Sequence, residues 1–266
     1  MTPFRDLHRP GDPFILANAW DVGSARMLVA LGAKAIATSS AGYAFTRGLP
    51  DGGVVGRAEA IAHARDLAQN LSVPVSADLE DGYGPRPEDC AETVRLSIEA
   101  GLAGCCIEDV SASIEAYDPG LAAERMAAAA EAARKAPDFV FCARADGVMH
   151  GLYDLDEAIR RLQAFEAAGA EVLYCPMPGE KADLKRLVES VTAPVNALAA
   201  GPWTQVTGPE YAALGVARIS LGASLARATH KVIRDASLAM FGAGDFSDLG
   251  GIGSGEVNGY LEEGAR

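Results

Sequence analysis

Short apolar runs alternate along the chain with longer stretches in which apolar residues recur at helical spacing. The runs are rich in β-branched and aromatic residues, as is typical of strands. Because few polar residues interrupt them, the runs predict parallel strands that are buried on both faces. Eight such runs occur, at 14–20 (FILANAW), 34–40 (KAIATSS), 73–79 (VPVSADL), 104–109 (GCCIED), 138–144 (DFVFCAR), 170–176 (AEVLYCP), 193–198 (APVNAL) and 216–221 (VARISL).

The stretches between the runs predict helices. Residues 86–101 (RPEDCAETVRLSIEAG) and 154–169 (DLDEAIRRLQAFEAAG) have amphipathic spacing, and each ends in a glycine that can cap a helix. Eight strand–helix units in 266 residues predict an α/β protein of the (β/α)8, or TIM barrel, type. A doubly wound open sheet is the alternative.

The chain has no linker or shift in composition before about residue 240. We therefore predict one barrel domain over residues 1–240 and a C-terminal tail over residues 241–266. The tail is rich in glycine and polar residues and contains one short helix-like piece. It either packs on a neighbouring subunit, which we favour, or is loose.

Composition and charge exclude several classes of protein. Apolar residues make up 49% of the chain, which is enough for a large core. The net charge of −13 argues against nucleic acid as a partner. No apolar stretch approaches the roughly 18 residues of a membrane span, and the N-terminus lacks an apolar signal segment. The five cysteines form no CxxC pair, which favours reduced thiols and a cytoplasmic protein.

Acidic residues gather where the third and fourth runs end. In a barrel of this type the catalytic residues lie at the C-terminal ends of the strands. Asp78 and Glu80 are two apart, so in a strand they point the same way, and Glu108 ends the neighbouring run. Carboxylates that share one rim repel each other unless a cation holds them, and their oxygens suit Mg²⁺, with Mn²⁺ as a substitute. The alternative is that these acids cap helices or pair with Arg57 and Arg86.

Other polar side chains end the remaining runs. Arg144 could bind a substrate carboxylate or phosphonate through both of its forked nitrogens, or it could pair with Asp146 or Glu108. The Thr-Ser-Ser segment at 38–40 offers hydroxyl and backbone N–H donors beside a predicted helix start. The four histidines have no metal-binding spacing, and only His150 follows a run closely enough to reach the rim.

Several segments in this order resemble the isocitrate lyase/phosphoenolpyruvate mutase superfamily, from about residue 12 to residue 225. They are NAWD (18–21), TSSAGYAFTRGLPDG (38–52), VSADLEDGYG (75–84), CIED (106–109), CARADG (142–147) and PVNAL (194–198). The resemblance implies a (β/α)8 barrel that holds Mg²⁺ and a 2-oxo or enolate-forming carboxylate. It also implies a homo-oligomer, a dimer or tetramer, in which neighbouring subunits exchange a C-terminal helix.

The resemblance implies a role for each matching residue. Asp78 would be the direct metal ligand, and Glu80, Glu108 and Asp51 would hold waters bound to the metal. Thr38, Ser39 and Ser40 would bind the substrate carboxylate. Arg144 would bind the oxygen of the reacting group, and Asn196 would contact the distal part of the substrate. Asp51 and Arg144 are thus the candidate catalytic residues.

Two departures from the superfamily affect the expected reaction. The loop after the fourth run, DVSASIEAYDPG (109–120), has neither the Lys-Lys-Cys-Gly-His motif of the lyases nor the Lys-Thr-Asn-Ser type of the phosphonate mutases. The sixth run ends in Cys175-Pro176-Met177-Pro178 instead of the glutamate found in lyases for larger acids. The enolate-stabilising half of the site is thus present, but the substrate-specific half matches neither branch.

The expected function is a Mg²⁺-dependent carbon–carbon lyase. It would cleave or decarboxylate a small 2-oxo or 2-hydroxy dicarboxylate through an enolate-like intermediate. One alternative is a phosphonate P–C bond enzyme resembling phosphonopyruvate hydrolase or phosphoenolpyruvate mutase, in which Asp51 would orient the attacking water or hydroxyl. Another is a protein that binds 2-oxo acids without turning them over.

Overall fold

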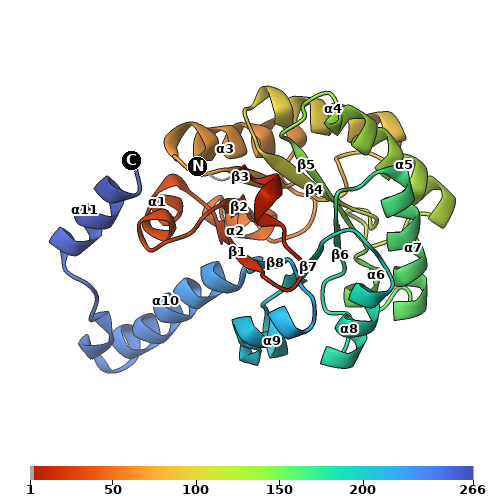
Figure 1. The fold of residues 1–266 in the computed structure, drawn as a ribbon. Helices are drawn as coiled ribbons and strands as arrows, with labels where there is room; N and C mark the ends of the chain where they lie inside the picture. Colours follow the sequence, from red (N-terminus) through yellow and green to blue (C-terminus); the bar gives the residue numbers. More distant parts are fainter. Residues whose placement is uncertain (1–2, 266) are drawn as a thin grey trace.

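The computed structural model describes residues 3–265, and its eight strands close into a parallel barrel in chain order (Figure 1). The first and last strands pair with each other, which excludes the open sheet. Each predicted run contains one strand. The strands are β1 (Phe14–Ala19), β2 (Ile36–Thr38), β3 (Val75–Asp78), β4 (Gly104–Glu108), β5 (Val140–Arg144), β6 (Val172–Tyr174), β7 (Val195–Leu198) and β8 (Arg218–Ser220).

Helices surround the barrel and close the end at which its strands begin. Residues 86–101 and 154–169 form α4 and α7 as predicted, and Gly169 ends α7 with a left-handed φ of 105°. The helices are η1 (Arg5–Leu7), α1 (Val22–Ala30), α2 (Ser40–Thr46), α3 (Arg57–Asn70), α4 (Pro87–Glu99), α5 (Pro119–Ala133), α6 (Gly147–His150), α7 (Leu155–Ala168), α8 (Lys181–Glu189), η2 (Gly201–Gln205), α9 (Gly208–Ala213), α10 (Ser224–Ala243), η3 (Ser247–Leu249) and α11 (Ser254–Glu263).

The main hydrophobic core lies between the strands and the surrounding helices. Leu162 and Phe165 of α7, for example, are fully buried in the same apolar cluster as Phe141 of β5. A second cluster, which includes Phe4 and Phe14, closes the N-terminal end of the barrel. Burial of side chains of this size contributes roughly 1.5–3 kcal/mol each to folding.

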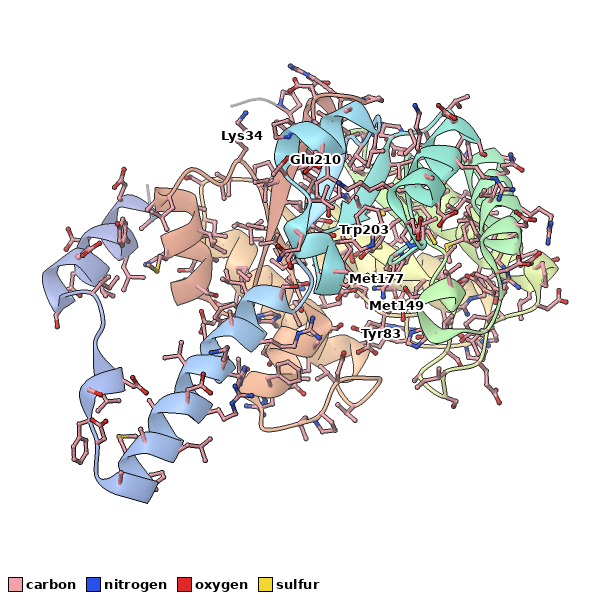
Figure 2. All side chains as sticks on the ribbon, turned by 90° about the horizontal axis from the view of Figure 1, so that it is seen from below. Lys34, Tyr83, Met149, Met177, Trp203 and Glu210 are labelled. Carbon is pink, nitrogen blue, oxygen red and sulfur yellow. The ribbon has the colours of Figure 1, made fainter. Side chains whose placement is uncertain are left out.

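All strands run in the same direction, so their C-terminal ends lie together. Tyr83, Met149 and Met177, which follow strands, lie at the end of the barrel opposite to Lys34 and Glu210, which precede strands (Figure 2). The register of β4 and β5 places Glu108 beside Arg144. The topology therefore gathers the polar strand ends at one mouth.

A buried polar cluster fixes the segment that follows β5. Asp109, immediately after β4, is fully buried, and its carboxylate accepts hydrogen bonds from the backbone N–H of Asp146 (2.8 Å), the hydroxyl of Tyr153 (2.8 Å) and Nη1 of Arg161 (3.1 Å). These bonds connect the end of β4 to α6 and α7. The cluster therefore supports the mouth of the barrel on the side of α6 and α7.

The C-terminal segment leaves the barrel and returns to it. Helix α10 runs away from the barrel, and α11 packs on α1 (Figure 1). The contact is close, since a Cβ on Gly264 would lie 1.9 Å from the carbonyl oxygen of Arg26. Helix α10 continues to Ala243, the third residue of the predicted tail. No helix within residues 3–265 combines the length and apolar character needed to cross a membrane.

Replacing Arg161 by methionine should lower the free energy of unfolding by about 3 kcal/mol, because it leaves the buried Asp109 carboxylate without its cation. Urea denaturation followed by circular dichroism measures this loss. The matched control is Arg160→Met, since Arg160 is exposed and pairs only with Glu157, and it should change stability by less than about 0.5 kcal/mol. Equal losses in the two variants would contradict the supporting role of the Asp109 cluster.

Candidate active site

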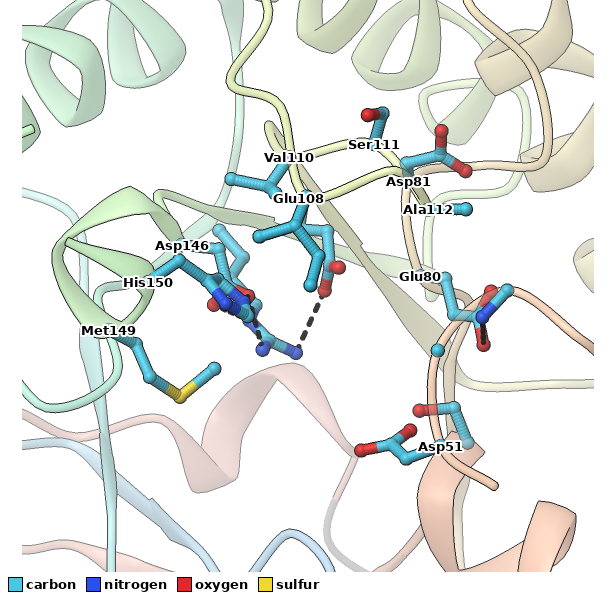
Figure 3. Close-up of a pocket in the computed structure, with 15 residues that line it drawn as sticks. Asp51, Glu80, Asp81, Glu108, Val110, Ser111, Ala112, Asp146, Met149 and His150 are labelled. Atoms are coloured by element: carbon cyan, nitrogen blue, oxygen red, sulfur yellow. Dashed lines mark hydrogen bonds and ion pairs between the residues drawn. The ribbon is translucent and has the colours of Figure 1, made fainter. Parts of the chain in front are cut away.

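The mouth of the barrel contains a cavity of about 200 Å³. Figure 3 shows Met149 and His150 on one wall and Asp51 and Glu80 on the opposite wall. The residues that line the cavity are Ser40, Asp51, Gly52, Gly53, Glu80, Asp81, Glu108, Val110, Ser111, Ala112, Ile114, Arg144, Asp146, Met149 and His150. The predicted site residues Asp51, Glu80, Glu108, Arg144 and Ser40 are thus brought together around one space.

Asp78 ends β3 and is held by the segment that follows β2. Its Oδ2 accepts hydrogen bonds from the backbone N–H (3.0 Å) and the hydroxyl (2.8 Å) of Ser40, while its own N–H donates to the hydroxyl of Thr38 (2.9 Å). Ser39 is buried, and its hydroxyl caps α2 by accepting from the N–H of Gly42 (3.1 Å). In this structure the donors predicted for a substrate carboxylate therefore face Asp78 or the helix start.

Glu80 reaches the mouth by a route that strand alternation did not predict. Strand β3 ends at Asp78, and Glu80 lies in a turn with a left-handed φ of 47°. Its carbonyl accepts a hydrogen bond from the N–H of Glu108 (2.9 Å), whereas Asp78 is level with Cys106. Glu80 and Glu108 are therefore level with each other at the mouth, and the prediction that Glu80 extends from the same strand as Asp78 was wrong.

The negative charge at the mouth is only partly neutralised by protein groups. Burial, and after it the charge of Asp78, raises the pKa of Glu80 to about 7. The same two causes raise the pKa of Asp51. Burial raises the pKa of Glu108 well above its usual value, and Arg144 opposes that rise. Burial is the largest cause of each shift, and for Glu108 the nearby Arg144 does not fully offset it.

Arg144 ends β5 and contacts three carboxylates. Its Nη1 lies 2.9 Å from Oε2 of Glu108 and 3.8 Å from Oδ1 of Asp78, and its Nη2 donates to Oδ2 of Asp146 (2.8 Å). Figure 3 shows these pairs with Glu108 and Asp146 as dashed lines. The pairing predicted as the alternative for Arg144 thus exists, and the guanidinium also lines the cavity.

Asn196 lies outside the mouth cavity. It is fully buried in β7, where it donates to the hydroxyl of Ser220 (2.9 Å) and accepts from Nε of Arg218 (2.8 Å). These residues line a smaller cavity of about 50 Å³ that also borders Asp78 and Arg144. Asn196 therefore faces the site from within the barrel rather than from its rim.

The loop between β4 and α5 covers the mouth, although the sequence pointed only to the motifs that it lacks. A bridge between Val110 and Ala116 closes it into a short hairpin, and Ile114 has a left-handed φ of 59°. The loop packs on the segment after α2, since a Cβ on Gly53 would lie 2.4 Å from Cβ of Ala112. The one sequence feature that pointed to the loop as a cover of the mouth was its position directly after a strand.

Two other residues near the mouth have clear placements. Asp81 accepts hydrogen bonds from the hydroxyl of Tyr117 (2.7 Å) and the N–H of Tyr83 (2.9 Å). His150, the one histidine expected to reach the rim, lines the cavity, and its Nε2 lies 3.1 Å from Oδ2 of Asp146. This contact could not be predicted from the sequence, because it depends on how the side chains of α6 pack.

The donor set suits a hard divalent cation. Within residues 3–265, no three His, Cys, Asp or Glu side chains are close enough to enclose a metal ion by themselves. The acids at the mouth nevertheless share one space and have raised pKa values, so a cation with water in its remaining positions would stabilise them. The residues present therefore fit Mg²⁺ or Mn²⁺.

The fold and the mouth define the class of protein: a (β/α)8 barrel with a carboxylate-rich cavity at the C-terminal ends of its strands. Residues 4–241 match the family model of phosphoenolpyruvate phosphomutase. The chain belongs to this family, and thereby to the isocitrate lyase/phosphoenolpyruvate mutase superfamily that its motifs resemble. Members of the superfamily are lyases and mutases, which supports a lyase-type function for this chain.

The chain is similar to proteins of both known and unknown activity. It is 37% identical over 220 residues to an uncharacterized protein of Mycobacterium tuberculosis, covering 82% of this chain and 81% of that one. It is 30% identical over 209 residues to 2-methylisocitrate lyase of Escherichia coli, covering 72% and 70%.

Solved structures agree with this placement. A Burkholderia cenocepacia protein, provisionally named a lyase/mutase, superposes with a TM-score of 0.92 at 41% identity, over 97% of this chain and 94% of that one. Phosphonopyruvate hydrolase, in complex with oxalate and Mg²⁺, superposes with a TM-score of 0.84 at 23% identity, over 98% and 94%. At that identity the second likeness shows the fold alone.

Replacing Glu80 by glutamine should stabilise the metal-free protein at pH 8 but not at pH 5. The pKa of Glu80 is about 7 in the folded state against 4.5 as its ordinary value. The folded state therefore binds more protons between these pH values, and stability falls as pH rises through this range. The variant escapes this loss, so its advantage should grow by on the order of 1–2 kcal/mol after allowance for partial exposure.

Urea denaturation in EDTA at pH 5 and pH 8 measures the difference between variant and wild type. The control is Glu131→Gln, which changes an exposed glutamate of α5 and should behave alike at both pH values. An advantage of Glu80→Gln that does not depend on pH would contradict the charge repulsion described for the mouth.

Proposed function

We propose that the protein is a Mg²⁺-dependent lyase that cleaves or decarboxylates a small 2-oxo or 2-hydroxy dicarboxylate through an enolate. The observation that carries the proposal is the group of carboxylates at the mouth, with raised pKa values, facing the guanidinium of Arg144. Such a site can take a divalent cation on one side and the anionic substrate on the other.

The cation would be held by the acids of the mouth. Asp78 would bind it directly, and Glu80, Glu108 and Asp51 would bind it through water, with Mn²⁺ able to substitute for Mg²⁺. When bound, the cation would supply Lewis-acid stabilisation of the charge that develops on the substrate oxygen. The complex of phosphonopyruvate hydrolase with oxalate and Mg²⁺ supports this assignment, because oxalate resembles an enolate and that protein shares the fold.

Arg144 would bind an oxygen of the substrate. Its guanidinium is largely buried and is fixed by Asp146 and Glu108. A buried, oriented guanidinium binds a carboxylate more strongly than one exposed to water. Ser40, whose N–H and hydroxyl donate to Asp78 in this structure, would turn these donors to the substrate carboxylate once the cation holds Asp78. Asp51, whose pKa is raised, would accept or orient a proton at the open side of the site.

The cover of the cavity favours a small substrate. Val110, Ala112, Ile114 and Met149 line it, and the cavity volume is about 200 Å³. Segment 109–120 has no cysteine, lysine or histidine to protonate the leaving carbanion of a larger acid. Decarboxylation of a β-keto acid such as oxaloacetate makes the fewest demands on that loop, so oxaloacetate is the first substrate to test.

A substrate panel tests the reaction class. Purified protein with Mg²⁺ is incubated with oxaloacetate, 2-methylisocitrate or phosphonopyruvate, and the release of pyruvate is followed over time. Turnover of oxaloacetate supports the proposal, whereas turnover of 2-methylisocitrate, a tricarboxylate, would support a lyase but overturn the dicarboxylate as its substrate. Turnover of phosphonopyruvate alone would replace it by P–C bond chemistry. No turnover of any acid, with oxalate and Mg²⁺ still bound, would replace it by a binding role.

Replacing Asp78 by asparagine should lower kcat/KM for the accepted substrate at least about 1,000-fold, because a direct metal ligand loses its charge. Steady-state kinetics at saturating Mg²⁺ measures the loss. The matched control is Asp81→Asn in the same segment, whose carboxylate is bound by Tyr117 and the N–H of Tyr83. That variant should lose stability but retain kcat within about tenfold, and similar losses of kcat in both variants would contradict the assignment of Asp78.

We further propose that the chain forms a homo-oligomer, a dimer or a tetramer, through its C-terminal segment. Helix α10 and the tail expose a row of large apolar side chains, and Ile15 on β1 is also 56% exposed. A second copy of α10 could cover that part of the barrel wall, and so large an exposed apolar surface favours association. The exposed apolar residues of this segment are Val232, Ile233, Leu238, Phe241, Phe246, Leu249 and Ile252.

A cytoplasmic location, where the five free thiols stay reduced, remains a prediction.

Replacing Val232 and Phe241 together by aspartate should shift the oligomer to monomers, because two charges would enter the proposed interface. Light scattering coupled to size-exclusion chromatography measures the mass at about 10 µM. The control is Lys185→Asp on the distant helix α8, which should keep the mass of the wild type. A wild-type protein that elutes as a monomer of 27.5 kDa would contradict the proposal.

A further inference from the structure

His150 occupies a defined position on the wall of the mouth cavity. It ends α6, a single turn that begins three residues after Arg144. A side chain at Gly147 could not be accommodated, since its Cβ would lie 2.1 Å from the ring of Tyr153, and Gly151 ends the turn with a left-handed φ of 67°. The backbone therefore places His150 over the same space as Arg144 and opposite Asp51 (Figure 3).

A buried carboxylate orients the imidazole. Nε2 of His150 lies 3.1 Å from Oδ2 of Asp146, whose side chain is 1% exposed. Asp146 is in turn fixed by Arg144 and by the bond of its N–H to Asp109 (2.8 Å). An ionised carboxylate only accepts hydrogen bonds, so Nε2 carries a proton. Nδ1 has no hydrogen-bond partner within residues 3–265, which leaves it free for the substrate.

The surroundings of His150 favour the charged imidazolium. The hydrogen bond to Asp146 raises the pKa of His150, against a smaller opposing effect of burial. Of the charged groups that face it, Asp146 and Asp51 raise the pKa and Arg144 lowers it. Burial alone would raise the pKa of Asp146, but Arg144 and His150 bring it below its usual value, so this carboxylate is ionised at neutral pH.

The cavity offers few other proton donors. Neither cysteine nor lysine is among the described residues that line it, and His150 is the one imidazole there. The acids on the opposite wall would be engaged with the cation, and a guanidinium does not deprotonate. A carbanion or enolate released in this space nevertheless has to gain a proton before the product can leave.

We propose that His150 is the catalytic acid of this enzyme and delivers a proton from Nδ1 to the enolate carbon, with Asp146 holding the ring in position. This inference rests on the proposed function. For oxaloacetate, the C3–C4 bond breaks to release CO₂, and its electron pair forms the enolate of pyruvate. The C2–C3 π pair then takes the proton from Nδ1 and forms the new C3–H bond. The imidazole, left neutral, regains a proton from solvent, so each turnover consumes one proton.

The test uses hydrogen exchange at C3 of pyruvate, in which the C3–H bond breaks to give the enolate and re-forms with deuterium, but no carbon–carbon bond is cleaved. Wild-type protein with Mg²⁺ and pyruvate in D₂O should exchange these protons, as followed by ¹H NMR. His150→Gln keeps a donor towards Asp146 but has no titrating nitrogen, and it should slow exchange at least about 100-fold. His230→Gln, the same change at an exposed histidine of α10 that does not line the cavity, is the control and should exchange within about threefold of the wild type.

A second readout is independent of activity and metal. In metal-free protein the imidazole signal that is absent from His150→Gln should titrate above the ordinary value of 6.5. In Asp146→Asn the same signal should titrate at a lower pH than in the wild type. Oxalate with Mg²⁺ should bind to His150→Gln within about twofold of its affinity for the wild type, because an acid acts on the reaction rather than on metal binding.

The outcomes separate this inference from the proposed function. If wild-type protein decarboxylates oxaloacetate and His150→Gln exchanges pyruvate as fast as the wild type, the role of His150 is overturned and the function stands. If His150→Gln only raises KM, the residue binds the distal carboxylate instead of donating a proton. If wild-type protein binds oxalate with Mg²⁺ but neither decarboxylates nor exchanges, both proposals are overturned.

Discussion

The repulsion among carboxylates at one mouth of the barrel is the constraint on which the rest of the site depends. Glu80, Glu108 and Asp51 line a common cavity, and Asp78 lines the smaller cavity beside it. Arg144, which borders both cavities, neutralises only part of their charge. Ionised carboxylates are costly in a partly buried site, and burial, followed by the charge of Asp78, raises the pKa of Glu80 to about 7. A divalent cation would relieve that cost, and the same cation would polarise a bound acid. Instability of the empty site and catalysis thus have one physical origin.

The scaffold keeps these charges in place by two independent means. The first is the parallel register, which sets Glu108 beside Arg144 and gathers every strand end at the mouth. The second is the buried cluster around Asp109, which binds the N–H of Asp146 and the side chain of Arg161 behind the mouth. Asp146 in turn binds both Arg144 and His150. The cluster therefore connects α7 to the side chains that would contact the substrate and fixes their positions.

The fold was predictable from the sequence because it follows from periodicity. Each of the eight apolar runs contains one strand, and the glycine at 169 ends a helix as expected. The strands are shorter than the runs because the barrel bonds stop where the chain turns towards a helix. For example, the run at 34–40 contains a strand only at Ile36–Thr38. The Ser-Ser pair that follows instead starts α2.

The sequence predicted which residues form the site better than it predicted how they are arranged. Strand alternation placed Glu80 and Asp78 on one face, yet Glu80 reaches the mouth through a left-handed turn that no residue pattern announces. Asn196 matches a motif but is enclosed with Arg218 and Ser220 inside the barrel. The contact of His150 with Asp146 depends on how a one-turn helix packs on Tyr153, and such packing cannot be read from spacing alone.

The central claim, that the gathered acids form a cation site through which an anionic acid binds, is tested most directly by titrating oxalate into the protein in a calorimeter. With Mg²⁺ present, the account predicts saturable binding of one oxalate per chain, and with EDTA it predicts no measurable binding. Oxalate that binds equally well without a divalent cation would contradict the account.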